Sequence, residues 1–439
     1  MKILFISLGC DKNLVDSEMM MGLLRERGYE FTDDEVQADI IVVNTCGFIN
    51  DAKEESINTI ISMAQYKEQN LKALIVTGCL AQRYKNEILE EMPEIDAIVG
   101  TTAFDKICDV IDSVLEGKGK NSFDEIDRLC RPDTSRIITT GGYYSYLKIA
   151  EGCNKRCTYC SIPMIRGNYR SVPMDILIEE AKYLANNGIK ELILVAQETS
   201  VYGIDIYGKK SLPTLLKELC KITGIEWIRI LYCYPEEITD ELIETIKNEK
   251  KICNYIDMPI QHSSDNILRR MGRRTNEQDL RDIIGKLRNE IPDICLRTTL
   301  ITGFPGETKE DHEKLLDFID EMEFDRLGVF TYSQEEDTAA ANFDNQIDEE
   351  VKLDRRDEIM ELQQEISMDK SDRLIGKRME VIIEGKATDE DVYVARTYMD
   401  APGVDGYIFI KSEEELMSGD FAWVNVTGAM EYDLIGELC

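Results

Sequence analysis

The chain has 439 residues, and its 43% hydrophobic and 31% charged content is typical of a soluble globular protein. Its 51 basic and 85 acidic residues give a net charge of −34. This charge disfavours nucleic acids and anionic membranes as partners and favours a basic protein. The alternative is that the charge serves solubility alone. The two histidines exclude a three-histidine zinc site, whereas thirteen cysteines without a recognisable signal sequence point to metal or redox chemistry.

The first 116 residues repeat one pattern, in which a short β-branched segment is followed by small residues and then by a helical pattern. The helical patterns cover 17–28, 54–69 and 83–92. This alternation predicts an open parallel sheet of the flavodoxin or Rossmann kind with helices on both faces. Ligands of such sheets bind beyond the carboxyl ends of the strands, and the strand segments of this repeat end at Cys10, Cys46 and Cys79.

The rest of the chain changes pattern twice. Residues 117–138 contain turn residues and charges without periodicity, which predicts a linker. Residues 139–369 alternate strand and helix patterns about six times, which predicts a partial (β/α)6 barrel with its site at the carboxyl ends of the strands. Residues 350–373 form one charged helical pattern, and short strands separated by turn residues predict a small all-β barrel over 371–439. We therefore expect an α/β chain of three domains.

Three cysteines lie in the segment EGCNKRCTYC, at Cys153, Cys157 and Cys160, directly after the first predicted barrel strand. Three thiolates in one short loop can bind three irons of a [4Fe–4S] cluster. The fourth iron then has no protein ligand and is open to a substrate or cofactor. The alternatives are a zinc site without its fourth ligand and a chance grouping, but no histidine lies nearby in the sequence to complete a zinc site.

Cys10, Cys46 and Cys79 occupy equivalent places in the N-terminal repeat. Adjacent parallel strands are only about 5 Å apart, so the three loops can converge on a second cluster. The alternative is that they are buried structural thiols. The other cysteines show no ligand spacing and are interpreted as core or incidental thiols: Cys108, Cys130, Cys220, Cys233, Cys253, Cys295 and Cys439.

The CxxxCxxC spacing resembles the signature of radical S-adenosylmethionine enzymes, and the whole chain resembles the methylthiotransferase family. That family joins an N-terminal three-cysteine domain, a radical S-adenosylmethionine barrel and a C-terminal TRAM β-barrel. Its RimO-type branch is the most similar, although Asp11 replaces a usual proline and Val172 an often-found arginine. The segments that carry the resemblance are 7–18, 151–171, 195–208, 232–235, 255–274, 296–308, 324–340 and 401–410.

The resemblance implies a reaction on the β-carbon of a specific aspartate in ribosomal protein uS12 of the small subunit. An auxiliary [4Fe–4S] cluster on Cys10, Cys46 and Cys79 would carry a sulfur that one S-adenosylmethionine methylates. A second cluster, on the CxxxCxxC cysteines, would use another S-adenosylmethionine to form the 5′-deoxyadenosyl radical that abstracts the hydrogen. The first domain should then cover the barrel mouth. No catalytic side chain is implied, so that assignment stays unknown.

Weaker assignments concern the surroundings of the clusters. Arg166 and Arg170 are candidates to bind the substrate aspartate because they lie near the cluster loop, and His262 is interpreted as a hydrogen-bonded structural residue. Each candidate cofactor contact has an ordinary alternative as a core, strand-end or turn residue. Those candidates are Tyr159, Gln197, Glu198, Arg297 and Gly303.

Charge also bears on the partner. The predicted C-terminal barrel has 6 basic and 15 acidic residues, which suits a basic ribosomal protein better than tRNA, unless it only reflects an acidic proteome. We expect a cytoplasmic enzyme with an electron donor such as flavodoxin or ferredoxin, no membrane and no direct nucleic-acid binding. The alternatives are a MiaB-type tRNA adenosine methylthiotransferase and, more distantly, a non-catalytic iron–sulfur ribosome-assembly factor or an electron-transfer protein.

Overall fold

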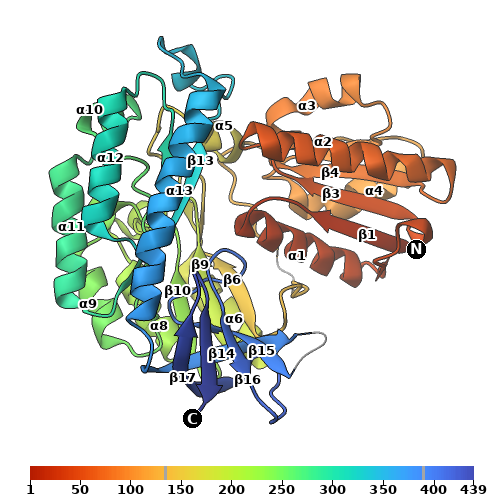
Figure 1. Cartoon of the computed structure of the whole chain (residues 1–439). Coiled ribbons are helices and arrows are strands. Elements are labelled where there is room, and N and C mark those ends of the chain that lie inside the picture. Colours follow the sequence, from red (N-terminus) through yellow and green to blue (C-terminus); the bar gives the residue numbers. More distant parts are fainter. Residues whose placement is uncertain (133–135, 388–390) are drawn as a thin grey trace.

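The computed structural model describes residues 1–132, 136–387 and 391–439 (Figure 1). An N-terminal sheet domain lies beside a central barrel, and a small β-barrel closes the chain. The predicted linker contains residues 133–135, and the predicted C-terminal barrel contains 388–390, which lie outside the described residues. The described part of 117–138 forms no helix and only one isolated bridge, between Val99 and Ser122.

The N-terminal domain is a five-stranded parallel sheet in the order β2-β1-β3-β4-β5, which confirms the predicted open sheet. Helices α1 and α4 bury their apolar residues on one face, and α2 and α3 on the other. Because both faces are covered, β3 and β4 are buried along their whole length and consist mostly of apolar residues. The elements are β1 (Lys2–Ser7), α1 (Asp11–Glu26), β2 (Glu30–Phe31), β3 (Ile40–Thr45), α2 (Asn50–Ala64), β4 (Ala73–Gly78), α3 (Cys79–Glu91), β5 (Ala97–Val99) and α4 (Ile107–Leu115).

The central domain has six parallel strands in two sheets, β10-β9-β6 and β11-β12-β13. Backbone hydrogen bonds from Cys253 to Ile228 and from Cys233 to Asp257 join β10 to β11, so the two sheets form the predicted partial barrel. The strands are β6 (Tyr144–Lys148), β9 (Glu191–Val195), β10 (Trp227–Ile230), β11 (Tyr255–Asp257), β12 (Cys295–Thr302) and β13 (Arg326–Thr331).

Helices cover the outside of this barrel and bury one continuous apolar core against it. They are α6 (Met174–Asn186), α8 (Leu212–Cys220), α9 (Asp240–Asn248), α11 (Glu277–Glu290) and α12 (Lys309–Met322). Short elements surround the carboxyl ends of the strands: β7 (Ala150–Glu151), α5 (Ile162–Arg166), β8 (Arg170–Ser171), α7 (Ile204–Tyr207) and α10 (Asp265–Arg270). None of the described helices is long and apolar enough to cross a lipid bilayer.

Helix α13 (Glu349–Asp372) runs along β13 and α12 to the C-terminal domain, which confirms the predicted charged helix. That domain is the predicted small β-barrel, closed in the order β14-β15-β16-β18-β17. Its strands are antiparallel except for the pair β16 and β18. They are β14 (Arg378–Lys386), β15 (Val392–Thr397), β16 (Ile408–Lys411), β17 (Phe421–Ala429) and β18 (Leu434–Leu438).

The C-terminal barrel covers the amino-terminal ends of the central strands. Glu191, the first residue of β9, accepts hydrogen bonds from Arg396 at 2.7 Å and from Arg229 at 2.8 Å, and all three side chains are fully buried. The ring of Trp227 at the start of β10 packs edge-on against Phe421 with 5.0 Å between centroids. The cysteine loops therefore lie at the opposite, carboxyl ends of the strands.

Candidate functional site

The three cysteines of the N-terminal repeat lie together at the carboxyl edge of the sheet. Cys10 directly precedes α1, Cys46 directly follows β3, and Cys79 is the first residue of α3. A Cβ added to Gly9, which has a φ of +84°, would lie 2.7 Å from the Cβ of Cys46. A Cβ on Gly47 would lie 2.9 Å from the backbone of Leu80. The three loops therefore meet at one point, although they are far apart in the sequence.

The protonation of these thiols reflects their crowding. Burial, together with the neighbouring Cys79, raises the pKa of Cys46 to about 12. Burial also raises the pKa of Cys79, and the Arg166 guanidinium opposes that rise. A bound metal reverses this tendency, because a coordinating thiol is deprotonated outright. Three neighbouring thiols at one edge, with Cys79 buried and Cys10 and Cys46 half-buried, are a donor set that fits an iron–sulfur cluster.

The other triad lies in the loop between β7 and α5. The backbone folds tightly there, since Gly152 has a φ of +72° and a Cβ on it would lie 2.1 Å from the carbonyl oxygen of Asn168. Burial raises the pKa of Cys153 to about 11 and that of Cys160 well above its ordinary value, and in both cases the neighbouring Cys157 adds to the rise. The donor set again fits a cluster.

In the part of the chain that the structure describes, no group of three or more His, Cys, Asp or Glu is placed to hold a single metal ion. A [4Fe–4S] cluster requires a different arrangement, because the three protein thiolates bind three separate irons and need not converge on one point.

Of the predicted cofactor residues, three lie near the CxxxCxxC loop or at the end of β9. Tyr159 packs edge-on against Phe304, with 6.4 Å between centroids, and interacts with the thiol of Cys157. Gln197 and Glu198 follow β9, and each has one buried side-chain oxygen without a hydrogen-bond partner among the described residues. Burial raises the pKa of Glu198 to about 7. Buried acceptors are rarely left unpaired, so these oxygens fit a bound ammonium group such as that of S-adenosylmethionine.

Two other predicted cofactor residues are engaged within the protein. The guanidinium of Arg297 forms ion pairs with Asp257 at 2.8 Å and with Asp405 of the C-terminal domain at 3.3 Å. Gly303 has a φ of +69°, and a Cβ there would lie 2.2 Å from the Cγ of Lys352 on α13. The contacts of both residues join the barrel to other elements, and no described contact joins either residue to the cysteine triads.

The two predicted substrate-binding arginines have different surroundings. Arg166, at the end of α5, is 2% exposed and donates to Asn13 Oδ1 at 2.6 Å and to Asp16 Oδ2 at 2.7 Å. Its Nη2 also lies 3.5 Å from the Sγ of Cys79. Arg170 instead pairs with Asp127 at 3.4 Å, in the segment predicted as a linker. Arg166 therefore connects the loop of one triad to a cysteine of the other, and Arg170 does not.

A buried cluster of charges surrounds Arg166. Asp16 on α1 and Glu151 on β7 are its anionic partners, and Lys148 on β6 forms ion pairs with both of them. All four side chains are at least nine-tenths buried. This group of charges joins the N-terminal domain to the barrel next to Cys79.

Sequence reasoning gave no role to Tyr232 and Gln261, which follow β10 and β11. Both have left-handed backbone conformations, with φ of +62° and +71°, and such strain in residues other than glycine gathers at functional sites. The Lys12 ammonium lies 3.4 Å from the centroid of the Tyr232 ring, and Gln261 has a buried oxygen without a partner among the described residues. Tyr232 and Gln261 lie within the segments 232–235 and 255–274, which carry the family resemblance. That resemblance was the signal in the sequence that could have identified both residues.

Contacts at the carboxyl ends of the barrel strands hold the N-terminal domain in place. Lys53 of α2 and Arg83 of α3 each lie 2.8 Å from the carboxylate of Glu335, which follows β13. The hydroxyl of Thr101 donates to the carbonyl oxygen of Ile165 in α5 at 2.9 Å. The first domain therefore lies against the carboxyl ends of the barrel strands, where the family resemblance implied that it should be.

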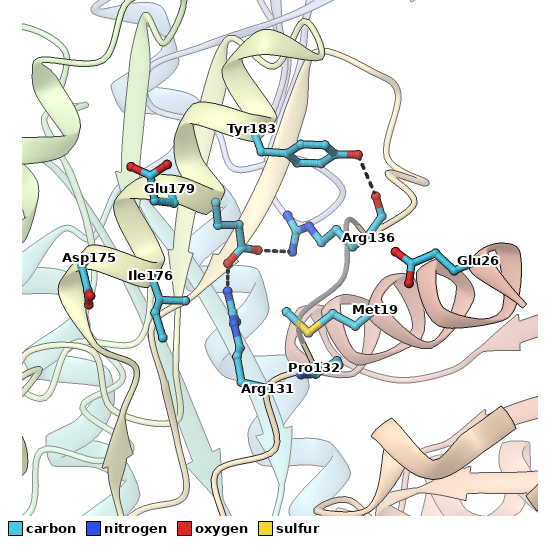
Figure 2. Close-up of a pocket in the computed structure, with 10 residues that line it drawn as sticks. Met19, Glu26, Arg131, Pro132, Arg136, Asp175, Ile176, Glu179 and Tyr183 are labelled. Atoms are coloured by element: carbon cyan, nitrogen blue, oxygen red, sulfur yellow. Dashed lines mark hydrogen bonds and ion pairs between the residues drawn. The ribbon is translucent and has the colours of Figure 1, made fainter. Parts of the chain in front are cut away.

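A separate pocket of about 620 Å³ lies between α1 and α6 (Figure 2). Arg131 and Arg136 form ion pairs with Glu180 there, and the hydroxyl of Tyr183 donates to the backbone oxygen of Arg136 at 3.3 Å. None of the six cysteines of the two triads lines it. We assign this pocket no role.

The fold and the CxxxCxxC loop define the class of protein. The radical SAM superfamily profile matches residues 147–319, the TRAM domain profile matches 375–439, and the profile of the uncharacterized protein family UPF0004 matches 2–100. Solved structures of the radical S-adenosylmethionine methyltransferase TsrM from Kitasatospora setae share the fold at 14% identity. One has a TM-score of 0.54 over 75% of this chain and 74% of that chain, and the other has 0.56 over 88% and 79%. The protein is a radical S-adenosylmethionine protein with a TRAM domain.

Curated relatives identify the family within this class. The ribosomal protein uS12 methylthiotransferase RimO of Lachnoclostridium phytofermentans is 64% identical over 437 residues, which cover 99% of each chain. The protein of the same name from Clostridioides difficile is 52% identical and covers 100% of this chain and 99% of its own. The chain belongs to the RimO family of ribosomal protein uS12 methylthiotransferases.

Proposed function

We propose that this protein attaches a methylthio group to the β-carbon of an aspartate in ribosomal protein uS12. The observation that carries the proposal is the 64% identity to a RimO enzyme over the full length of both chains. A tRNA adenosine substrate is not favoured, because the relatives with 50–64% identity are named for uS12.

Radical chemistry suits this substrate. The hydrogen on the β-carbon of an aspartate is unactivated, and a carbanion beside the carboxylate would concentrate negative charge. Bound S-adenosylmethionine and two [4Fe–4S] clusters would supply the one-electron chemistry and the methylthio group, and homolytic removal of the hydrogen avoids that charge. The cofactors supply this chemistry, and the protein supplies binding, orientation and exclusion of side reactions.

We assign the ligands by geometry and donor type. Cys153, Cys157 and Cys160 would hold the cluster that binds S-adenosylmethionine, and the triad of Cys10, Cys46 and Cys79 would hold the auxiliary cluster. The buried oxygens of Gln197 and Glu198 would accept hydrogen bonds from the ammonium group of S-adenosylmethionine. Tyr159 would shield the cluster on Cys153, Cys157 and Cys160 from water through its packing on Phe304.

Arg166 has the surroundings of a positioning residue rather than a substrate ligand. Its guanidinium faces Asp16, Glu151 and the thiol of Cys79, all of them groups of the protein itself. We therefore assign it to the support of the auxiliary triad, where its charge stabilises the thiolate form of Cys79.

The same proposal extends to the partners and the place of action. A basic ribosomal protein is attracted to a chain of net charge −34, whereas nucleic acids and anionic membranes are repelled. Reduction of the clusters requires an electron donor such as flavodoxin or ferredoxin. Modification of a ribosomal protein places the enzyme in the cytoplasm.

A paired product assay tests the function. The protein is reconstituted with iron and sulfide without oxygen and given S-adenosylmethionine and a reductant, together with a peptide of the uS12 loop and an unmodified tRNA. Mass spectrometry is expected to find the methylthio group on the peptide aspartate and none with Cys157→Ala. A methylthio group on the tRNA alone would refute the uS12 assignment.

A further inference from the structure

An apolar groove runs along the outer surface of the N-terminal domain, between α2 and α3. Its volume is about 990 Å³. The two helices pack on the strands beneath them, and Lys53 of α2 also contacts the hydroxyl of Tyr84 on α3 at 3.4 Å. Ile57 and Ile61 of α2 line it and are 38% and 52% exposed, and Tyr84 and Ile88 of α3 line the opposite side. Apolar side chains exposed side by side in a concave surface are typical of a binding site.

The rim of this α2–α3 groove is acidic. Five exposed glutamates line it, and none of them forms an ion pair with a described residue: Glu54, Glu68, Glu87, Glu91 and Glu94. Among the residues that the structure describes, Lys53 is the only basic one that lines the groove, and it is already paired with Glu335. The groove therefore combines an apolar floor with uncompensated negative charge.

One end of the groove adjoins the auxiliary triad. Asn50 lines the groove and lies four residues after Cys46, and Leu80 lines it and directly follows Cys79. At the same end, Lys53 and Tyr84 contact Glu335 and Glu336 at the carboxyl edge of the barrel. A polypeptide in the groove would therefore lead towards the place where the two domains meet.

We propose that the α2–α3 groove binds a segment of the protein substrate in which basic residues flank apolar ones, and so guides the target loop to the site. This inference rests on the proposed function, since ribosomal proteins are basic. Charge complementarity selects this occupant. A second copy of this acidic chain, an acidic electron carrier or an anionic membrane would be repelled by the five glutamates.

The test compares full-length uS12 with a short peptide that contains only the target loop and lacks the segments that would occupy the groove. Ile61→Asn removes the apolar side chain from the groove without adding charge, at a position exposed enough to accept a polar group. We expect the KM for full-length uS12 to rise about tenfold with an unchanged kcat, as for the loss of one interface anchor. The KM for the peptide should stay at the parent value.

A second variant tests the charge, namely Glu87→Gln with Glu91→Gln and Glu94→Gln. It should raise the KM for full-length uS12 at low salt and flatten the dependence of that KM on salt. The matched control for the Ile61 variant is Val36→Asn in the same domain, where the side chain is 49% exposed and does not line the groove. It should behave as the parent.

The outcomes are distinguishable. A parent enzyme that modifies neither form of uS12 would refute the proposed function and this inference with it. Normal turnover by the parent, with a parental KM for full-length uS12 in both groove variants, would refute the docking surface alone. Equal losses on peptide and full-length protein would also refute it, because the groove would then act on the site itself.

Discussion

At the scale of single residues, the site is held by groups that compensate one another. Arg166 is the clearest case, because its two carboxylate partners and the Cys79 thiol are all buried. Burial of these groups is tolerated only while each charge keeps its partner.

Arg166→Gln removes the cation and leaves Asp16 and Glu151 with Lys148 alone. We expect the free energy of unfolding to fall by about 3–5 kcal/mol and the iron bound at the auxiliary site to decrease. Arg166→Lys keeps the charge but loses the planar fork, so its effect should be intermediate. Calorimetry and iron analysis check both effects, and parental iron content in the glutamine variant would contradict the supporting role.

His262 predicts a pH dependence of stability. Burial lowers its pKa to about 3, and its Nδ1 accepts hydrogen bonds from the backbone of Ser263 and Ser264 at 2.9 Å. Below about pH 6.5 the unfolded chain therefore binds one more proton at this residue than the folded chain does. The contribution of His262 to stability is thus fully present above that pH and is lost as the pH falls. At pH 5 the free energy of unfolding should be lower by about 2 kcal/mol. His262→Asn keeps an acceptor without this proton, and urea unfolding at pH 7.5 and pH 5 should show a smaller difference than in the parent.

At the scale of elements, α1 and α3 begin earlier than their sequence patterns indicated, at Asp11 and Cys79 instead of 17 and 83. The first turns of α1 are polar, yet Lys12, Asn13 and Asp16 are buried because they face the barrel rather than solvent. The spacing of apolar residues cannot reveal where such a helix begins, because its first turns contain polar residues. The earlier starts place two of the cysteines at helix amino termini.

Gly9 tests the loop that precedes α1. Gly9→Ala adds a Cβ 2.7 Å from Cys46 at a φ of +84°, whereas Gly28→Ala has a similar φ of +91° with nothing within 4 Å. Both variants pay about 1–2 kcal/mol for the left-handed backbone. Only Gly9→Ala should lower iron and sulfide incorporation after reconstitution. Equal incorporation in the two variants would show that the loops tolerate separation.

At the scale of the whole molecule, the two small domains lie at opposite ends of the barrel strands. The C-terminal barrel is fixed at the amino ends through the buried network of Glu191, Arg229 and Arg396. The N-terminal domain lies at the carboxyl ends, beside the cysteine loop. The exposed glutamates of the α2–α3 groove lie on the N-terminal domain, and thus on the same side of the barrel as the cysteine loop.

Glu191→Gln tests the fixation of the C-terminal barrel. It leaves two buried guanidinium groups without their shared anion, so we expect a loss of about 3–5 kcal/mol in unfolding free energy. The exposed pair of Lys247 and Glu290 provides the control, and Glu290→Gln should cost less than about 1 kcal/mol. Thermal unfolding and limited proteolysis compare the two, and an equal, small effect would mean that the network does not hold the domain.

The sequence by itself determined the domain order, the sheet and barrel patterns and the CxxxCxxC motif, because each of these is written in residues close together along the chain. Only the tertiary structure decided that Cys10, Cys46 and Cys79 meet, that Arg166 lies against Cys79 while Arg297 pairs with the C-terminal domain, and that α2 and α3 leave a groove. Those features depend on the packing of segments that are distant in sequence, and no local pattern records which distant segment a polar side chain will face.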